Sequence, residues 1–301
     1  MNQTQKSRGK VVSIWRYPVK SMMGEELNSS YVTERGLIGD RVYAIIDQET
    51  GKVASAKNPG KWGRLFDFRA AFVDSLQQQA VEEMMMGDED NINIPPVKIT
   101  LPDGSQIFSD DGDVDNTLSK VLGREVSVMK AIAKKSNNTN NVENPTYEEY
   151  WPDIEGLAQR GVVTDESMPP HTFFDIAVIH LLTTSTINLL RELYPEGRFE
   201  VRRFRPNIVV ESSTAVSEDK KNFIENSWIG KNLTIGEETV LRVIGPCTRC
   251  VMTTLPQGDL PKDLGILRTV AKYNQVHAGV YASVHRGGGT IRRGDPVQLE
   301  R

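Results

Sequence analysis

The sequence predicts a mainly β protein with some helix, of the α+β class, arranged as two β-barrel-like domains. One observation is the length: the chain has 301 residues, which at about 150 residues per domain corresponds to two ordinary domains. A second is that short β-branched and aromatic runs, separated by turn residues, recur along the chain. Few segments keep helical spacing, which favours barrels over a doubly wound sheet.

In the first half of the chain we expect strands at residues 11–15, 41–46, 52–56, 97–101 and 105–108. A loop that ends at Gly51 joins the second and third of these and predicts a hairpin. The turn Pro102-Asp103-Gly104 joins the last two and predicts another. Helical spacing of apolar residues predicts a helix over Val114–Leu122, which Gly123 ends.

In the second half we expect strands at residues 175–181, 207–211, 233–235, 240–244 and 279–284. The hydroxyls of Thr183, Thr184 and Ser185 offer caps for a helix that runs to about Tyr194. A further helix is expected over residues 264–273.

Two polar stretches interrupt this pattern, at residues 77–93 and 134–149. The second is rich in asparagine and poor in apolar residues, a composition that favours turns or disorder. We place the domain boundary there, which predicts domains over residues 1–135 and 150–301.

Composition and charge exclude several classes of protein. Lys plus Arg number 36 and Asp plus Glu 40, so the net charge is −4, which argues against a general binder of nucleic acid or anionic membrane. The longest apolar segment, residues 173–182, is too short to span a bilayer and is interrupted by Asp175 and His180. Residues 1–8 lack the apolar stretch of a signal peptide, so we expect a cytoplasmic protein without a membrane span.

The two cysteines, Cys247 and Cys250, are three residues apart and leave several readings open. A redox pair of the thioredoxin type needs a helix after the second cysteine, but residues 251–254 are poor helix formers. A zinc site needs two more ligands, and the four histidines are scattered. Two buried thiols acting as small hydrophobes are a further reading. Arg249 between the cysteines favours the thiolate, the form that binds a soft metal, if a cofactor brings the other ligands.

Cationic residues form a second feature. Arg198, Arg202, Arg203 and Arg205 lie within eight residues and indicate either a solvated charged face or an anion site. In an extended segment, Arg203 and Arg205 share one side and Phe204 faces the other. Further donors for an anion are Asn207, Lys20, Ser21 and Arg41.

Together these motifs resemble the MOSC family, in the branch that contains the mitochondrial amidoxime-reducing components and their bacterial homologues. Residues 18–21 (Pro-Val-Lys-Ser) and 39–41 (Gly-Asp-Arg) resemble the N-terminal β-barrel domain of that family. Residues 204–209, 247–250 and 294–297 resemble the MOSC domain itself.

The resemblance implies that Cys250 ligates the molybdenum of a molybdopterin cofactor held in a cleft between the two domains. It implies that Arg249 is a second catalytic residue and that Cys247 is structural or supports the site. Cofactor-binding residues implied by the family are Lys20, Ser21, Arg41, Lys57, Thr184, Ser185, Arg205, Asn207 and Arg249.

The implied function is reduction of small N-hydroxylated compounds at a Cys-ligated oxo-molybdenum centre. Two cysteines cannot hold an iron–sulfur cluster, and no pyridoxal phosphate is expected. Electrons are therefore expected from a separate ferredoxin or a cytochrome b5-like protein with its reductase. The alternative is a carrier of molybdenum cofactor, or of sulfur as a persulfide, without reductase activity.

Overall fold

The computed structural model describes residues 9–73, 94–131, 172–212 and 223–300. These residues fall into two compact units that interleave along the sequence. Unit 1 contains residues 1–15, 26–38 and 177–301, and unit 2 contains residues 16–25 and 39–176. The polar stretches at residues 77–93 and 134–149, and with them the predicted domain boundary, lie outside the described residues.

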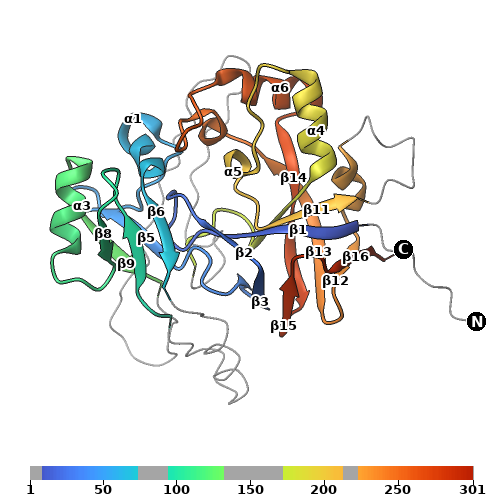
Figure 1. The fold of residues 1–301 in the computed structure, drawn as a ribbon, viewed down its shortest axis with the longest axis horizontal. Helices are drawn as coiled ribbons and strands as arrows, with labels where there is room; N and C mark the ends of the chain where they lie inside the picture. The colour runs from blue at the N-terminus through green and yellow to red at the C-terminus, as the bar shows by residue number, and fades with distance from the viewer. Residues whose placement is uncertain (1–8, 74–93, 132–171, 213–222, 301) are drawn as a thin grey trace, which may run out of the picture. The chain divides into compact units, whose positions relative to one another are not determined.

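A closed barrel forms the centre of unit 1. Its strands, in sheet order, are β11 (Ile208–Ser212), β10 (Ile179–Thr183), β14 (His277–Arg286), β13 (Thr239–Thr248), β12 (Asn232–Ile235), β16 (Pro296–Leu299) and β1 (Gly9–Arg16). An additional pairing of β11 with β1 closes the ring, and β2 (Glu25–Leu27) extends it beside β1. Figure 1 shows β1, in blue, lying beside β11 although about 190 residues separate them in the sequence.

Burial explains why these segments are strands. Every residue of β10 is buried, as expected for a strand with neighbours on both sides and a covered face. In β12, Leu233 and Ile235 are buried while Asn232 and Thr234 are half-buried, which is the alternation that a barrel wall requires. A smaller sheet of unit 1 pairs β15 (Gly289–Arg292), β3 (Ser29–Thr33) and β4 (Gly36–Leu37).

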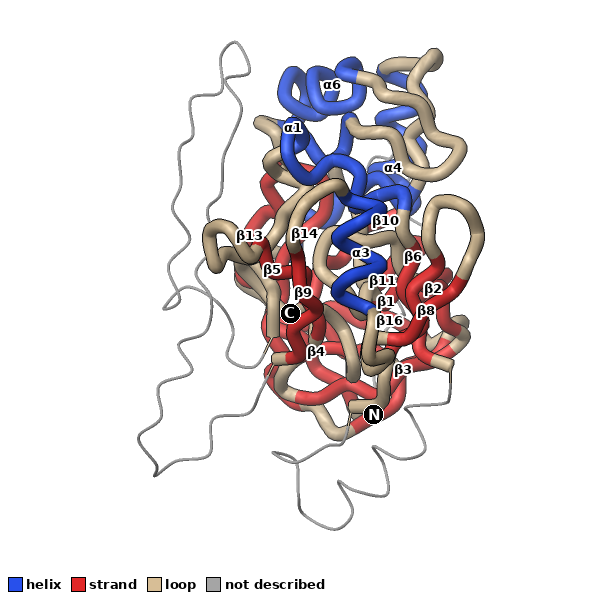
Figure 2. Tube along the Cα trace, turned by 90° about the vertical axis from the view of Figure 1, so that its left-hand side faces the viewer, coloured by secondary structure: helices blue, strands red, loops and turns tan. Residues whose placement is uncertain are grey.

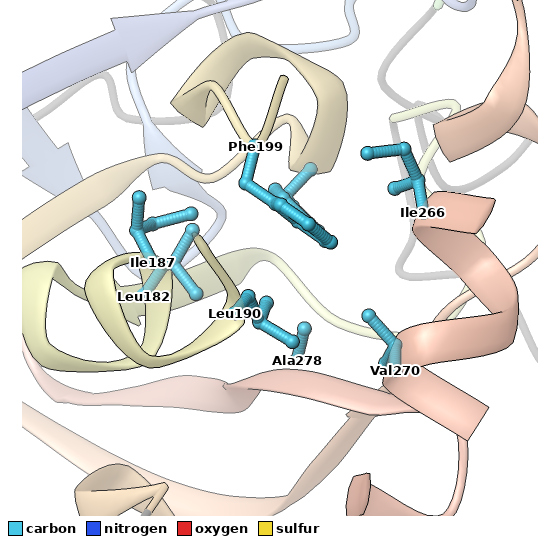
Figure 3. Packing of buried hydrophobic residues seen from close by; sticks show 8 residues of the cluster. Leu182, Ile187, Leu190, Phe199, Ile266, Val270 and Ala278 are labelled. Atoms are coloured by element: carbon cyan, nitrogen blue, oxygen red, sulfur yellow. The ribbon is translucent and has the colours of Figure 1, made fainter. Parts of the chain in front are cut away.

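Two longer helices, α4 (Thr184–Leu193) and α6 (Leu264–Asn274), pack on the barrel of unit 1. Thr183 caps α4 by accepting from the amide of Thr186, and Asp263 caps α6 by accepting from that of Gly265. Figure 3 shows how the two helices meet: their apolar side chains point into one cluster with residues of β10 and β14. The cluster contains Leu182, Ile187, Leu190, Phe199, Phe204, Ile266, Val270 and Ala278.

Shorter helices complete unit 1: α5 (Val201–Phe204), η5 (Ile224–Trp228) and η6 (Val251–Thr254). Figure 2 shows that strands, in red, make up most of the regular structure and that the helices are few. The mainly β class predicted from the sequence is confirmed.

The described residues of unit 2 form two small sheets. β5 (Tyr43–Asp47) pairs with β9 (Val126–Lys130), and β6 (Arg69–Phe72), β7 (Val97–Thr100) and β8 (Gln106–Phe108) form the other sheet. Its helices are α1 (Pro59–Trp62), η1 (Gly63–Asp67) and α3 (Val114–Leu122). Gly123 ends α3 with a φ of 70°, a left-handed conformation that suits glycine, at the position expected from the sequence.

Three local predictions are corrected by the structure. Residues 52–56 form no regular strand, although a bridge of Ile46 with Val53 and backbone hydrogen bonds from Asp47 to Lys52 and from Ala54 to Ile45 hold the segment beside β5. The strand expected from residue 175 begins at Ile179. Residues 203–205 are not extended, since α5 ends at Phe204 and the next residue, Arg205, is left-handed. The two arginines therefore do not share one side of a strand.

Candidate functional site

Both cysteines lie in one turn of unit 1. Cys247 is in the last part of β13, and Cys250 immediately precedes η6. Neither cysteine is in a disulfide, and both residues are buried. The carbonyl of Cys250 accepts from the amide of Thr253 at 3.1 Å and from its hydroxyl at 3.0 Å, which closes the turn. One 3-10 turn follows Cys250 rather than the α-helix that a thioredoxin-type pair needs.

Arg249 is anchored between the cysteine turn and α5. One terminal nitrogen, Nη1, donates to Sγ of Cys247 at 2.6 Å, and the other, Nη2, donates to the carbonyl of Phe204 at 2.7 Å. Burial alone would lower the pKa of Arg249, but the charges of Cys247, Tyr281 and Cys250 outweigh it and raise the pKa. The guanidinium therefore stays charged beside both sulfurs.

The third guanidinium nitrogen of Arg249 is the informative one. Its Nε is buried and has no hydrogen-bond partner among the residues that the structure describes. A buried donor without a partner carries a free-energy cost of about 1–3 kcal/mol, which a bound acceptor would remove. The contact with Cys247 also places the guanidinium on the first cysteine of the pair.

Asn207 holds strands together. Its Oδ1 accepts from the amide of His180 at 3.0 Å, and its Nδ2 donates to the carbonyl of Trp15 at 3.3 Å. Both ends of the amide therefore bind backbone, in addition to any role toward a ligand. Arg205 follows α5 and is buried, and its carbonyl lies 3.5 Å from Nδ1 of His180.

Thr184 and Ser185 are half-buried in the first turn of α4. The polar network at this helix end centres on Glu225 instead. The hydroxyls of Thr183 and Thr186 donate to Oε2 of Glu225 at 2.8 and 2.7 Å. Burial raises the pKa of Glu225 despite these bonds.

In unit 2, Lys20 and Lys57 converge on one carboxylate, Asp175. Lys20 binds it and also donates to the carbonyl of Phe173 at 3.0 Å, while Nζ of Lys57 lies 3.0 Å from Asp175 Oδ2. Burial would raise the pKa of Asp175, but the two ammonium groups outweigh it and lower the pKa. Lys20 and Lys57 are both buried and share this carboxylate.

Ser21 and Arg41 lie in the same unit. The Oγ of Ser21 accepts from the amide of Ala56 at 3.1 Å, which joins the segment after Lys20 to the segment before Lys57. Arg41 pairs with Asp40, and its guanidinium carbon lies 4.4 Å from the ring centre of Tyr17 and 5.2 Å from that of Phe174. The predicted unit 2 residues therefore lie on neighbouring loops.

Backbone conformation marks three of the predicted residues. Ser21, Arg41 and Arg205 have φ angles of 63°, 51° and 51°. Left-handed φ is uncommon outside glycine and costs free energy, and such residues cluster at functional sites.

The arginine cluster divides in the structure. Arg198 and Arg202 pair with Glu200 and Asp259, so their charge is neutralised at the surface. Arg203 is fully buried, where it binds backbone carbonyls. Of the four, Arg205 is the residue that stays a candidate for a ligand.

The donor set fits an anionic cofactor with a soft metal better than it fits a bare metal ion. No group of three or more His, Cys, Asp or Glu side chains is placed to hold a metal within the described ranges. Within unit 1, the cysteine pair and a buried Nε of Arg249, which has no hydrogen-bond partner among the described residues, suit a ligand that brings its own sulfur and oxygen atoms.

Comparison with protein families decides the relationship. The MOSC N-terminal beta barrel domain matches residues 8–124, and the MOSC domain matches residues 169–298. The chain belongs to the MOSC family. Within the described part of this MOSC protein, no helix is long and apolar enough to cross a membrane.

Curated MOSC relatives are distant. The molybdenum cofactor sulfurase of Oryza sativa subsp. japonica is 25% identical over 280 residues, which cover 87% of this chain and 30% of the sulfurase. The mitochondrial amidoxime reducing component 2 of Rattus norvegicus is 24% identical over 310 residues, which cover 96% of this chain and 82% of that protein. The human component 2 is 22% identical. The chain thus spans less than a third of the sulfurase and most of the amidoxime reducing component.

Solved structures give weaker matches. The YUAD protein from Bacillus subtilis is 10% identical with a TM-score of 0.44, over 97% of this chain and 94% of that chain. YiiM from Geobacillus stearothermophilus is 20% identical with a TM-score of 0.30, over 42% and 55%.

Sequence reasoning missed Asp175 and Glu225 as polar centres of this MOSC protein. Asp175 was visible as a charge that interrupts the apolar segment at residues 173–182, which is the signal that marks a buried carboxylate with partners. Glu225 stands beside the stretch at residues 213–222 and carried no comparable signal.

Proposed function

We propose that this MOSC protein binds the molybdenum cofactor through Cys250 and reduces small N-hydroxylated compounds. The observation that carries the proposal is the cysteine turn, in which Arg249 donates to Cys247 and keeps a buried Nε that has no hydrogen-bond partner among the described residues. The mitochondrial amidoxime reducing components, which align with nearly the whole chain, support the choice of reaction.

The residues of the chain have separate tasks in this proposal. Cys250 provides the thiolate ligand, and Arg249 stabilises it by its charge and donates from Nε to an oxygen of the ligand. Arg205, Asn207, Thr184 and Ser185 belong to the same unit and are proposed to contact the organic part of the cofactor. When bound, the molybdenum cofactor supplies two-electron chemistry at a metal that accepts oxygen.

Unit 2 is proposed to supply positive charge to the anionic cofactor. Lys20, Lys57 and Arg41 carry it, and Ser21 adds a hydroxyl. Asp175 and Asp40 hold these cations in place, so that the side chains are already ordered before a ligand binds.

The overall reaction balances with two electrons and two protons: R–NH–OH + 2 e⁻ + 2 H⁺ gives R–NH₂ + H₂O. We propose that the electrons come from a separate one-electron carrier, a ferredoxin or a cytochrome b5-like protein with its reductase. A cytoplasmic location is part of the same proposal and is tested by fractionating cells that express the chain.

A carrier function is the second candidate. It is favoured by the matches to molybdenum cofactor sulfurases, in which this chain corresponds to less than a third of the protein. The chain would then hold the cofactor, or sulfur as a persulfide on Cys250, without turnover.

The test is to express the chain in a host that makes the cofactor, measure molybdenum per chain, and assay benzamidoxime with reduced methyl viologen. Turnover together with about one molybdenum per chain supports the reductase. Bound metal without turnover supports the carrier, and sulfane sulfur without metal supports the persulfide.

Matched cysteine variants identify the ligand. Cys250→Ser is expected to lower bound molybdenum at least about tenfold, because the hydroxyl is a poor ligand for a soft metal. Cys247→Ser is expected to keep the metal and to lower stability by about 1–2 kcal/mol, the usual range for a buried substitution. Equal loss of molybdenum in both variants would contradict the assignment of Cys250.

A further inference from the structure

Helix α6 is lined on its outer side by a groove that contains cationic and exposed apolar side chains, whereas its inner side is apolar and buried. The inner side of α6 is covered, because Ile266 and Val270 point into the apolar cluster of Figure 3. The groove runs from the end of α4 along α6 and is lined by Tyr194, Lys262, Leu264, Arg268, Lys272 and Tyr273. We call it the α6 groove.

The α6 groove is cationic in a protein of negative net charge. Lys262, Arg268 and Lys272 are exposed and form no ion pair with any residue that the structure describes. The one carboxylate in the lining, Asp263, is engaged by the amide of Gly265 at 2.8 Å. This differs from the surface at Arg198 and Arg202, where acidic partners neutralise the charge.

Apolar side chains lie among these cations. Leu264 is 47% exposed and Tyr273 is 44% exposed. Gly265 lets the ring of Tyr194 close over the start of α6, since a Cβ at that position would lie 2.4 Å from Cε1 of Tyr194. Exposed aromatic and aliphatic groups ringed by cations are typical of a surface that docks a partner of opposite charge.

A short, well-fixed path connects the groove to the cysteine turn. The amide of Asp263, at the start of α6, donates to the carbonyl of Thr254 at 2.9 Å, and Thr254 is the fourth residue after Cys250. The buried Arg203 reinforces this link: it donates to the carbonyls of Thr253 at 3.2 Å and of Pro261 at 2.8 Å. The segment between Cys250 and α6 is therefore held from both ends.

We propose that the α6 groove is the docking surface for an acidic one-electron carrier protein. This inference rests on the proposed reductase function, whose electrons come from outside the chain. Lys262, Arg268 and Lys272, which have no acidic partner within the described part of the chain, attract an acidic surface over distance and speed encounter. Leu264 and Tyr273, whose ring centre lies 4.8 Å from Nζ of Lys272, provide an apolar contact among these charges. Two docking events deliver the two electrons that convert N–OH and two protons to N–H and water.

The test uses the cofactor-loaded full chain and two probe donors, a soluble cytochrome b5 domain and a plant-type 2Fe–2S ferredoxin, each with its reductase. The variant carries Lys262→Glu, Arg268→Glu and Lys272→Glu. We expect KM for the preferred donor to rise at least about tenfold at low ionic strength, and the difference to shrink at high salt. Turnover with reduced methyl viologen and the melting temperature stay at the level of the unmodified chain.

The matched control carries Lys120→Glu, Lys231→Glu and Arg242→Glu. These residues are exposed and lie outside the groove lining, and the three substitutions change the net charge by the same amount as those of the groove variant. An unchanged donor KM in the groove variant, or an equal rise in the control, would overturn the proposal. Binding of ATP or phosphate is measured by calorimetry as well. If the groove variant alone loses that binding while its KM for the donor stays the same, the groove binds a small anion and the proposal is overturned.

Failure of the proposed function is distinguishable from failure of this inference. If the loaded chain turns over nothing with methyl viologen, the reductase function fails. Docking is then measured as salt-sensitive binding of the oxidised donor in calorimetry. Loss of that binding in the groove variant alone supports the surface, and equal binding by both variants overturns it.

Discussion

Glu225 is the residue whose protonation has a predictable effect on stability. It is fully buried, accepts two threonine hydroxyls at Oε2, and leaves Oε1 without a partner among the described residues. Burial raises its pKa in the folded state above the usual 4.5, so the folded chain binds the proton more tightly than the unfolded chain does. Protonation of Glu225 therefore contributes fully to the unfolding free energy below pH 4.5, and this contribution is lost as the pH rises through the raised pKa of the folded state.

We therefore predict that Glu225→Gln flattens the pH dependence of folding. The amide keeps an acceptor for Thr183 and Thr186 and does not titrate. Relative to the variant, the unmodified chain should lose up to about 1.4 kcal/mol of unfolding free energy per pH unit above the usual pKa of a glutamate. Urea unfolding from pH 5 to pH 8 measures this, and parallel profiles for the two proteins would contradict it.

At the scale of residues, sequence predicted the groups that carry chemistry better than it predicted their partners. Cys250, Arg249 and Lys20 were identified from spacing and resemblance, because a chemical requirement restricts which residue types can stand there. That Arg249 binds Cys247, and that Asp175 joins Lys20 to Lys57, depends on segments far apart in the chain. Their role toward a cofactor stays a prediction.

Asn207 acts at the scale of elements, because its side chain fastens three strands. Asn207 stands directly before β11, and its side chain bonds to the backbone of His180 in β10 and to the backbone of Trp15 in β1. These bonds stand where β11 and β1 pair to close the barrel. The residue therefore has a structural task whether or not it also contacts a ligand.

We predict that Asn207→Ala lowers the unfolding free energy by about 2–4 kcal/mol, since it leaves a buried amide and a carbonyl without these partners. Asn116→Ala, at an exposed position of α3, is the control and should cost less than about 0.5 kcal/mol. Chemical denaturation of the cofactor-free chain makes the comparison. A loss for Asn207→Ala no larger than that of the control, together with loss of cofactor binding, would assign the residue to the ligand instead.

Elements with strong local signals were predicted within a few residues, as α3, α4 and α6 show. Their apolar spacing and their end residues act within the segment itself. The wrong elements were those that tertiary partners decide. The segment after β5 returns beside it through one bridge and two backbone hydrogen bonds without forming a regular strand, and α5 replaces the alternating pattern at residues 203–205.

At the scale of the whole molecule, the barrel of unit 1 depends on a strand from the other end of the chain. β1 lies between β16 and β11, and the family match to the MOSC domain at residues 169–298 does not include it. The mainly β class followed from composition and turn spacing. The interleaving of the two units did not, since no local pattern records which distant strand closes a sheet.

We predict that a fragment of residues 172–301 does not fold alone, because it exposes the edges of β11 and β16 that β1 covers. Adding a peptide of residues 9–17 should restore protected amides in these strands, whereas a scrambled peptide should not. Hydrogen exchange measured with and without the peptide is the test. A fragment that is fully protected on its own would show that the barrel closes without β1.

The position of β1 in the barrel also affects when the barrel can form during synthesis of the chain. β1 is made long before β11 and β16, the two strands that flank it in the barrel, whereas its other neighbour, β2, follows it closely in the sequence. Residues 39–176 of unit 2 are complete in between and can fold while the nascent chain is still attached. Until β11 and β16 have been made, β1 lacks the two strands that flank it in the closed barrel, so the order of synthesis places closure of the barrel late.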